Sequence, residues 1–407
     1  RRGAEWTGDR GWGVFVALSA LRVSDSADHG LGDLSALEEL GVIVAELGGN
    51  VVSTLPLCAT RPDEASPYSP LTRRWFDERW VDPAWVARRL GLPAVETRRP
   101  AEGDLADTLH AWSQTREALA PMAATPQAQA AIDEWMPLHR GVEVWARFKA
   151  AARLHGWDPR EWPEVVDGVV REGGDVTAIG LEPADVRFEV FCQWAVQSQL
   201  AQVHEHFDEI GVGLYLDLPV GVSAASFDVW EHPEWFATDM SIGAPPDRFF
   251  PEGQNWGLRP IHPIAAVATD HAYLRACLEA QMRHCRLLRI DHVMGLHRLF
   301  WVPDSSPDGD GAYVSYPADE QWNVVMETAG RFGVTVVGEN VGNVPDEVRT
   351  AMEDRRVPGL FLGQDELRPP FRIARPVPSG CVASLNTHDL APFAAWIASD
   401  APGDTTG

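Results

Sequence analysis

The chain has 407 residues, of which 45% are hydrophobic and 23% are charged, and this balance is typical of a globular protein and excludes a disordered or fibrous one. Its 34 basic and 59 acidic residues leave a formal charge of −25, which opposes nucleic acid as a partner and favours a neutral substrate. The five cysteines are scattered without CxxC spacing, so neither a disulfide framework nor a zinc site is expected.

Short apolar runs that predict strands alternate with stretches that predict helices. The run "GVFVALS" (13–19) is followed by a helical stretch over 35–49, in which apolar residues recur at helical spacing, and then by "NVVSTLPL" (50–57). Residues 84–180 interrupt this rhythm, because they contain helical stretches punctuated by proline and glycine with no strand between them. We interpret them as a helical insertion.

The alternation resumes after the insertion. Helices are predicted over 187–209, 264–284, 317–332 and 345–354. The strands predicted between and after them are 211–219, 286–291, 334–340, 359–362 and 381–386. Strands that are apolar on both faces and alternate with helices indicate a parallel sheet covered by helices.

A (β/α)8 barrel and a doubly wound sheet both fit this alternation. Asp217, Asp291, Glu339 and Asp389 each lie at the carboxyl end of a predicted strand, which is where barrel enzymes place catalytic groups. No glycine-rich turn follows the first strand, as a nucleotide-binding doubly wound sheet would require. We therefore predict an α/β fold of the TIM-barrel type, with residues 1–83 and 181–407 in the barrel and residues 84–180 in the helical insertion.

Four carboxylates at one face of a barrel admit two kinds of chemistry. They could ligate a divalent metal, or two of them could act on a glycosidic bond as acid and nucleophile. Each one alone could also simply cap the helix that follows it. Arg289 shares a strand face with Asp291, and its guanidinium would repel a metal ion while keeping that carboxylate ionised. We therefore expect no metal and no cofactor. His292 and His388 can donate hydrogen bonds to substrate hydroxyl groups, although lone histidines are more often ordinary packed residues.

Eight segments carry a resemblance to a known family. In chain order they are "HGLGDL" (29–34), "SPYSPLTRRW" (66–75), "FCQWAVQSQL" (191–200), "LDLPVGV" (216–222), "GAPPDRFFPEGQNWGLRP" (243–260), "RIDHVMGLHRLFWVP" (289–303), "GENVGNVPDEV" (338–348) and "SLNTHDLAPFAAW" (384–396). By these segments the chain resembles the 4-alpha-glucanotransferases, also called amylomaltases or disproportionating enzymes, of glycoside hydrolase family 77. The resemblance implies that maltooligosaccharides and other alpha-1,4-glucans are the substrates and that the mechanism is retaining.

The resemblance also implies a role for each site residue. Asp291 would be the nucleophile, with Arg289 beside it, and Glu339 would be the acid/base. Asp389, helped by His388, would hold the sugar hydroxyls next to the reacting carbon. The remaining residues expected to contact the glucan are Tyr68, Asp217, Asp247, Gln254, Trp256 and His292.

Three features depart from the family pattern. Asn340 follows Glu339 where the family usually has an acid, and Arg248 stands where shorter members often have an aromatic residue. Only 18 residues follow Asp389, so we expect the chain to be an internal fragment that lacks strand eight and has little activity alone. Two alternatives stay open: a hydrolase of the amylase type, and an inert glucan-binding fragment.

The sequence contains no signal for a membrane. No stretch reaches 18 uninterrupted apolar residues, and no basic segment followed by an apolar one opens the chain. We therefore expect a cytoplasmic protein with neither a membrane nor nucleic acid among its partners.

Overall fold

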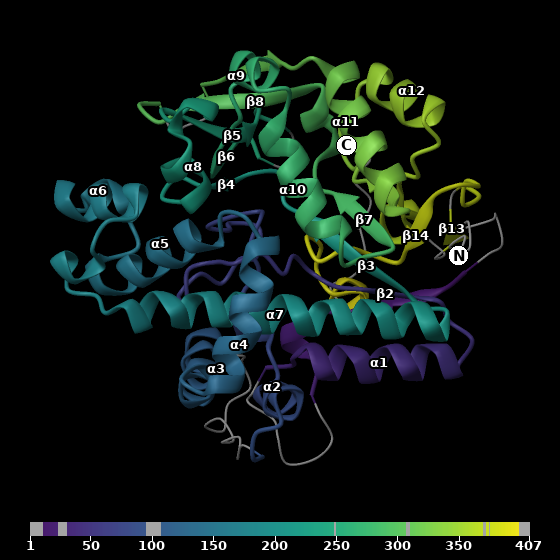
Figure 1. Ribbon diagram of the computed structural model, residues 1–407. Coiled ribbons are helices and arrows are strands. Elements are labelled where there is room, and N and C mark those ends of the chain that lie inside the picture. Colours follow the sequence, from purple (N-terminus) through teal and green to yellow (C-terminus); the bar gives the residue numbers. More distant parts are fainter. Residues whose placement is uncertain are drawn as a thin grey trace.

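The computed structural model describes residues 11–22, 31–94, 107–247, 250–306, 310–368, 372–373 and 375–398 (Figure 1). Seven parallel strands follow one another in chain order, each within an apolar run that predicted it. They are β1 (Gly13–Phe15), β2 (Val51–Ser53), β3 (Gly213–Leu218), β7 (Leu287–Ile290), β10 (Thr335–Gly338), β11 (Leu360–Leu362) and β14 (Val382–Ser384).

The strands associate as a barrel wall would. The first five pair side by side in the order β1-β2-β3-β7-β10, and β11 pairs with β14. The backbone N–H of Gly338 donates to the carbonyl of Pro358 at 2.9 Å, so β10 and the start of β11 are also joined. All polar residues that follow these strands therefore lie at one edge of the array. The expected absence of an eighth strand stays a prediction.

Helices cover the parallel strands. Figure 1 shows α1 (Leu34–Glu46) lying alongside the long α7 (Pro183–Ile210). Gly41 permits this close approach, because a Cβ atom there would lie 2.1 Å from the ring of Phe207. The other helices that alternate with the strands are α10 (Ala272–Met282), α11 (Ala318–Phe332) and α12 (Asp346–Asp354), with α13 (Gly363–Glu366) and α14 (Phe393–Ala398) near the end.

One predicted helix is in fact two. The stretch 264–284 divides into α9 (Pro263–Ala268) and α10, because Asp270 and His271 adopt positive φ values of 50° and 52° between them. A single helix over the whole stretch was therefore wrong.

The insertion is helical in its described part. It contains α2 (Pro83–Leu90), α3 (Thr108–Ala123), α4 (Pro126–Trp135), α5 (Val142–His155) and α6 (Glu164–Glu172). In Figure 1 these helices gather around one end of α7. The limits of 84 and 180 for a separate subdomain stay a proposal.

A second sheet was missed by the sequence interpretation. It is five-stranded and antiparallel in the order β4-β6-β5-β8-β9. Its strands are β4 (Val222–Ser223), β5 (Met240–Ala244), β6 (Gln254–Arg259), β8 (Arg298–Pro303) and β9 (Ala312–Ser315), with α8 (Phe227–Glu231) between β4 and β5; a short hairpin, β12 (Leu367–Arg368) and β13 (Arg372–Ile373), stands apart. The segments that follow β3 and β7 therefore build a sheet of their own beside the barrel.

Within the described ranges, no helix combines the length and the apolar character that crossing a bilayer requires.

Candidate active site

Strand register places the predicted acids at one level. Asp217 lies opposite Arg289 in the β3–β7 pair, and Ile290 lies opposite Gly338 in the β7–β10 pair. Asp291 and Glu339, one residue further along, continue the ladder, because their N–H groups donate to Leu218 and Ile290 at 3.1 and 3.0 Å. Backbone hydrogen bonds to the neighbouring strands thus fix the main-chain positions of Asp291 and Glu339.

Arg289 is the buried centre of this group. Its Nη1 donates to both oxygens of Asp217, at 2.9 and 2.7 Å, and its Nη2 lies 2.8 Å from Oδ1 of Asp291. The hydroxyl of Tyr68 donates to Asp217 at 2.5 Å. One guanidinium therefore serves two carboxylates, and this arrangement leaves a positive charge where a divalent metal would have to bind.

Opposing effects set the pKa of Asp291. Burial raises the pKa of Asp291 to about 7; Arg289 acts in the opposite direction, and Asp217, Glu339 and Asp389 raise the pKa further. Arg289 thus favours the ionised form, as expected, but loss of water outweighs it. The expected effect of the arginine is therefore present, but it is opposed by burial and by the neighbouring carboxylates.

Glu339 is held by backbone donors. The N–H of His292 donates to its Oε2 at 2.9 Å, and the N–H of Val341 donates to its Oε1 at 2.6 Å. His292 can aim its N–H this way because its φ is 48°, in the left-handed region. Burial raises the pKa of Glu339, against the lowering effects of Arg289 and of these two donors. A carboxyl that keeps its proton more readily is suited to general acid catalysis.

Asn340 does not face the acids. Its Oδ1 accepts the backbone N–H of Leu360 at 2.8 Å, and a Cβ on Gly359 would lie 2.4 Å from its side chain. The residue therefore fastens β10 to β11 where the regular ladder between them is interrupted. A glycine is required at 359 for this approach.

His388 and Asp389 close the other side of the site. The ring of His388 stacks on Tyr68 with centroids 4.9 Å apart and planes 8° from parallel. Its Nε2 lies 3.2 Å from Oδ1 of Asp389, and this hydrogen bond lowers the pKa of Asp389. Asp389 is 67% exposed, so it faces the solvent-accessible side of the group.

The hairpin formed by β5 and β6 contributes the outer residues. Trp256 meets His292 edge to face with centroids 5.3 Å apart, and its Nε1 donates to Gln254 at 3.3 Å. Asp247 accepts the N–H of Phe250 at 2.6 Å within its own turn. Arg248 lies outside the described residues. The structure thus brings Trp256 next to the strand-end residues.

Sequence reasoning missed two charged groups. Arg73 lines a cavity of about 50 Å³ together with Asp291 and His292, and its backbone N–H donates to a buried acid, Asp228, at 3.0 Å. The paired arginines that follow Tyr68 by a few residues, in "TRR", were the available signal, since arginine is rarely buried without a specific partner.

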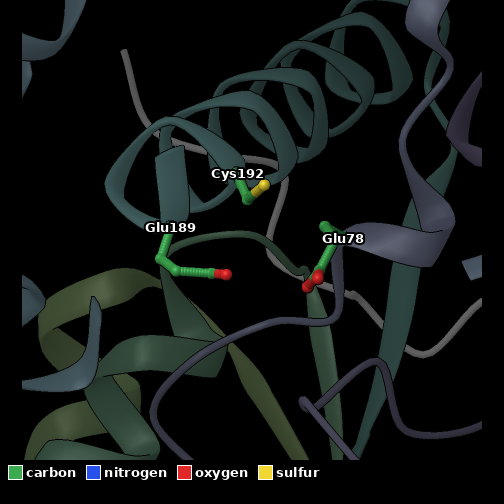
Figure 2. Close-up of side chains that lie close together, drawn as sticks. All are labelled: Glu78, Glu189 and Cys192. Carbon is green, nitrogen blue, oxygen red and sulfur yellow. The ribbon is translucent and has the colours of Figure 1, made fainter. Parts of the chain in front are cut away.

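A second set of side chains has the spacing of metal ligands. Glu78, Glu189 and Cys192 point toward one another in Figure 2, and their ligand atoms lie within 4.8 Å. Arg116 already occupies that position, because its Nη1 lies 2.5 Å from Glu78, 3.0 Å from Glu189 and 4.0 Å from Cys192. Lys149, the only lysine of the chain, bonds the other oxygen of Glu78. This is a buried ion network, and it supports no metal site.

Known proteins resemble the chain over nearly its whole length. A sequence model of the family described as 4-alpha-glucanotransferase matches residues 16–406. Proteins named 4-alpha-glucanotransferase are 31% identical in Mycobacterium tuberculosis strain H37Rv, over 97% of this chain, and 30% identical in Haemophilus influenzae, over 93% of it. This chain spans only 58% and 59% of the length of those two relatives.

Two solved structures share the fold. The crystal structure of amylomaltase from Corynebacterium glutamicum superposes with a TM-score of 0.79 at 24% identity, covering 95% of this chain and 56% of that one. Amylomaltase from Streptococcus agalactiae in complex with acarbose gives a TM-score of 0.82 at 18% identity, covering 96% of this chain and 81% of that one. The predicted barrel-type fold with an insertion is thereby confirmed.

Proposed function

Because this chain belongs to the 4-alpha-glucanotransferase family, glycoside hydrolase family 77, we propose that its protein transfers alpha-1,4-glucan segments from a donor to an acceptor glucan. The observation that carries the proposal is the Arg289 guanidinium bridging Asp217 and Asp291, next to a second carboxyl, Glu339, at the end of the adjoining strand. Asp291 is paired with a cation, whereas Glu339 is held by neutral backbone donors. Two carboxyl groups in such different surroundings are suited to the different roles of nucleophile and acid/base.

Asp291 is the proposed nucleophile. Its carboxylate would attack the anomeric carbon of the donor while the bond from that carbon to the leaving oxygen breaks, forming a covalent glucosyl-enzyme. Arg289 supports this role because it favours the ionised form of Asp291 and fixes Oδ1 at 2.8 Å, which leaves Oδ2 for the substrate. Asp217 holds the guanidinium from the opposite side, so the arginine is not free to rotate away.

Glu339 is the proposed acid/base. It would give its proton to the leaving oxygen in the first step and take the proton of the acceptor hydroxyl in the second, when the Asp291–sugar bond breaks. Its raised pKa supports the first role. The N–H groups of His292 and Val341 support the second, because they stabilise the carboxylate left after the first proton is given.

The outer residues are proposed to bind the glucan. Tyr68 and His388 would present their stacked rings to the donor sugar, and Asp389 would hold its hydroxyl groups. Asp247, Gln254, Trp256 and His292 would lie along the acceptor path. Transfer in place of hydrolysis requires a sugar to occupy that path before water reacts with the intermediate. We propose a cytoplasmic location, which cell fractionation would test.

The test is the product pattern from maltotriose. Transfer yields glucose together with maltopentaose and longer oligomers, whereas hydrolysis yields only glucose and maltose. Asp291→Asn serves as the matched inactive control, since it preserves the shape of the side chain. Exclusive formation of shorter sugars would favour the alternative of an amylase-type hydrolase. Binding of acarbose without any turnover would favour a glucan-binding protein.

A further inference from the structure

The segment that carries Tyr68 is anchored by buried charges that the proposed reaction does not use. Tyr68 lies in the connection between β2 and α2, and five residues later the chain buries Arg73, which is 4% exposed. Its Nη1 donates to the carbonyl oxygens of Pro219 and Val220, at 3.0 and 3.1 Å. These are the first two residues after β3, which ends at Leu218. Arg73 thus joins the Tyr68 segment to the strand end that bears Asp217.

The rest of the Arg73 environment holds the guanidinium in place. Its Nε donates to the hydroxyl of Tyr273 at 3.3 Å, and that hydroxyl donates to Asp228 at 2.6 Å. The backbone N–H of Arg73 donates to the same Asp228 oxygen at 3.0 Å. A buried cation is stable only when its donors find partners of this kind. Asp228 thus holds the Arg73 backbone, while Tyr273, Pro219 and Val220 hold its guanidinium.

We propose that Arg73 is a positioning residue of the active site, which holds Tyr68 against Asp217 by tying the Tyr68 segment to the end of β3. A displacement of Tyr68 would reach the proposed nucleophile through successive contacts. Tyr68 donates to Asp217, Asp217 accepts both bonds from Nη1 of Arg289, and Arg289 pairs with Asp291. A shift of the Tyr68 segment would remove one of the donors that fix Asp217. The effect on the reaction rests on the proposed function, whereas the tether itself does not.

Arg74 provides the matched control. It is the next residue, and its guanidinium pairs with Asp228, at 2.9 Å, and with Glu231. Both of these partners lie on α8, and neither lies on β3. Arg73→Met also leaves Asp228 paired with Arg74, so the variant does not create an isolated buried charge.

The experiment compares Arg73→Met, Arg73→Lys and Arg74→Met with the wild-type protein. Steady-state disproportionation of maltotriose supplies kcat and KM, and hydrogen–deuterium exchange reports on the backbone amides of residues 66–71 and 220–223. For Arg73→Met we expect kcat to fall about 10- to 100-fold while KM stays within about threefold, because small displacements of catalytic groups reduce the rate of chemistry. Exchange should accelerate in both segments. Arg73→Lys should recover part of kcat, and Arg74→Met should keep kcat within about threefold.

Two results would overturn the proposal: a folded Arg73→Met variant with wild-type kcat, or an equal loss of kcat in Arg74→Met. Should Arg73→Met not fold, Arg73→Gln repeats the test with the same expectation and the same refuting outcome. A wild-type protein that does not transfer glucose refutes the proposed function instead. The exchange measurement then still decides the tether, since unchanged exchange at residues 66–71 and 220–223 in the Arg73 variant would refute it.

Discussion

Replacing Asp291 with asparagine is expected to stabilise the folded protein while abolishing transfer. Folding removes Asp291 from water and places it near other carboxylates, so its pKa rises from 3.8 to about 7. A carboxyl whose pKa is higher in the folded state stabilises the fold fully only below pH 3.8, and that stability is lost as the pH rises to about 7. Asparagine mimics the neutral form at every pH and escapes this loss.

The expected gain follows from the size of the pKa rise. At 1.36 kcal/mol per pKa unit, a rise from 3.8 to about 7 corresponds to about 4 kcal/mol at pH 8. At pH 5 only the interval above 3.8 counts, so the gain shrinks to about 2 kcal/mol. The side chain is 18% exposed, and Arg289 keeps Asp217 as a partner in the variant, so no isolated cation is created.

Urea unfolding of both proteins at pH 8 and pH 5 measures this difference. Asp389→Asn is the matched control of opposite sign. The pKa of Asp389 is lowered by His388, so its ionised form stabilises the fold above pH 3.8, and asparagine there should give no gain. The reasoning fails if Asp291→Asn is no more stable than the wild type at pH 8, or if its gain is the same at both pH values.

Three further predictions concern packing, metal and buried charge. Gly41→Ala should lower the free energy of unfolding by about 1–3 kcal/mol, since its Cβ would lie 2.1 Å from an aromatic ring. Gly168→Ala should raise the free energy of unfolding by about 0.5–1 kcal/mol, because a Cβ there would have nothing within 4 Å. Thermal unfolding of the two variants checks both signs. EDTA should leave maltotriose disproportionation unchanged, because the Arg289 guanidinium occupies the carboxylate cluster; loss of activity restored by Mg²⁺ would contradict this. Lys149→Met should destabilise the fold by about 3 kcal/mol in urea unfolding, because it breaks a buried pair with Glu78. Adding Glu78→Gln to this variant should recover part of the loss. If the double variant instead loses the sum of the two single losses, the pairing is contradicted.

The sequence alone was sufficient for the parallel strands and for the acids that follow them. Apolar runs such as 286–291 are buried on both faces, so their pattern depends little on which neighbours they meet. Asp291 and Glu339 became candidates because they directly follow such runs, where barrel enzymes place catalytic groups. The long α7 was predicted for a similar local reason, since its apolar residues recur at helical spacing over many turns.

The antiparallel sheet was decided by tertiary structure. The β6 segment "QNWGLR" mixes polar, aromatic and glycine residues, and only its hydrogen bonds with β5 make it a strand. Periodicity did not reveal this strand, because its sequence lacks a regular apolar pattern and β propensity depends on the neighbouring strand and on burial.

The electrostatics of the site were also beyond the sequence. Arg289 could be placed beside Asp291 from their spacing. Its two hydrogen bonds to Asp217, 72 positions earlier, depend on strand register. The direction of the Asp291 pKa depends on how much water the fold removes, and no local pattern encodes that quantity. Sequence therefore predicted which groups carry the chemistry, and the packing of distant segments decided how strongly each one holds its proton.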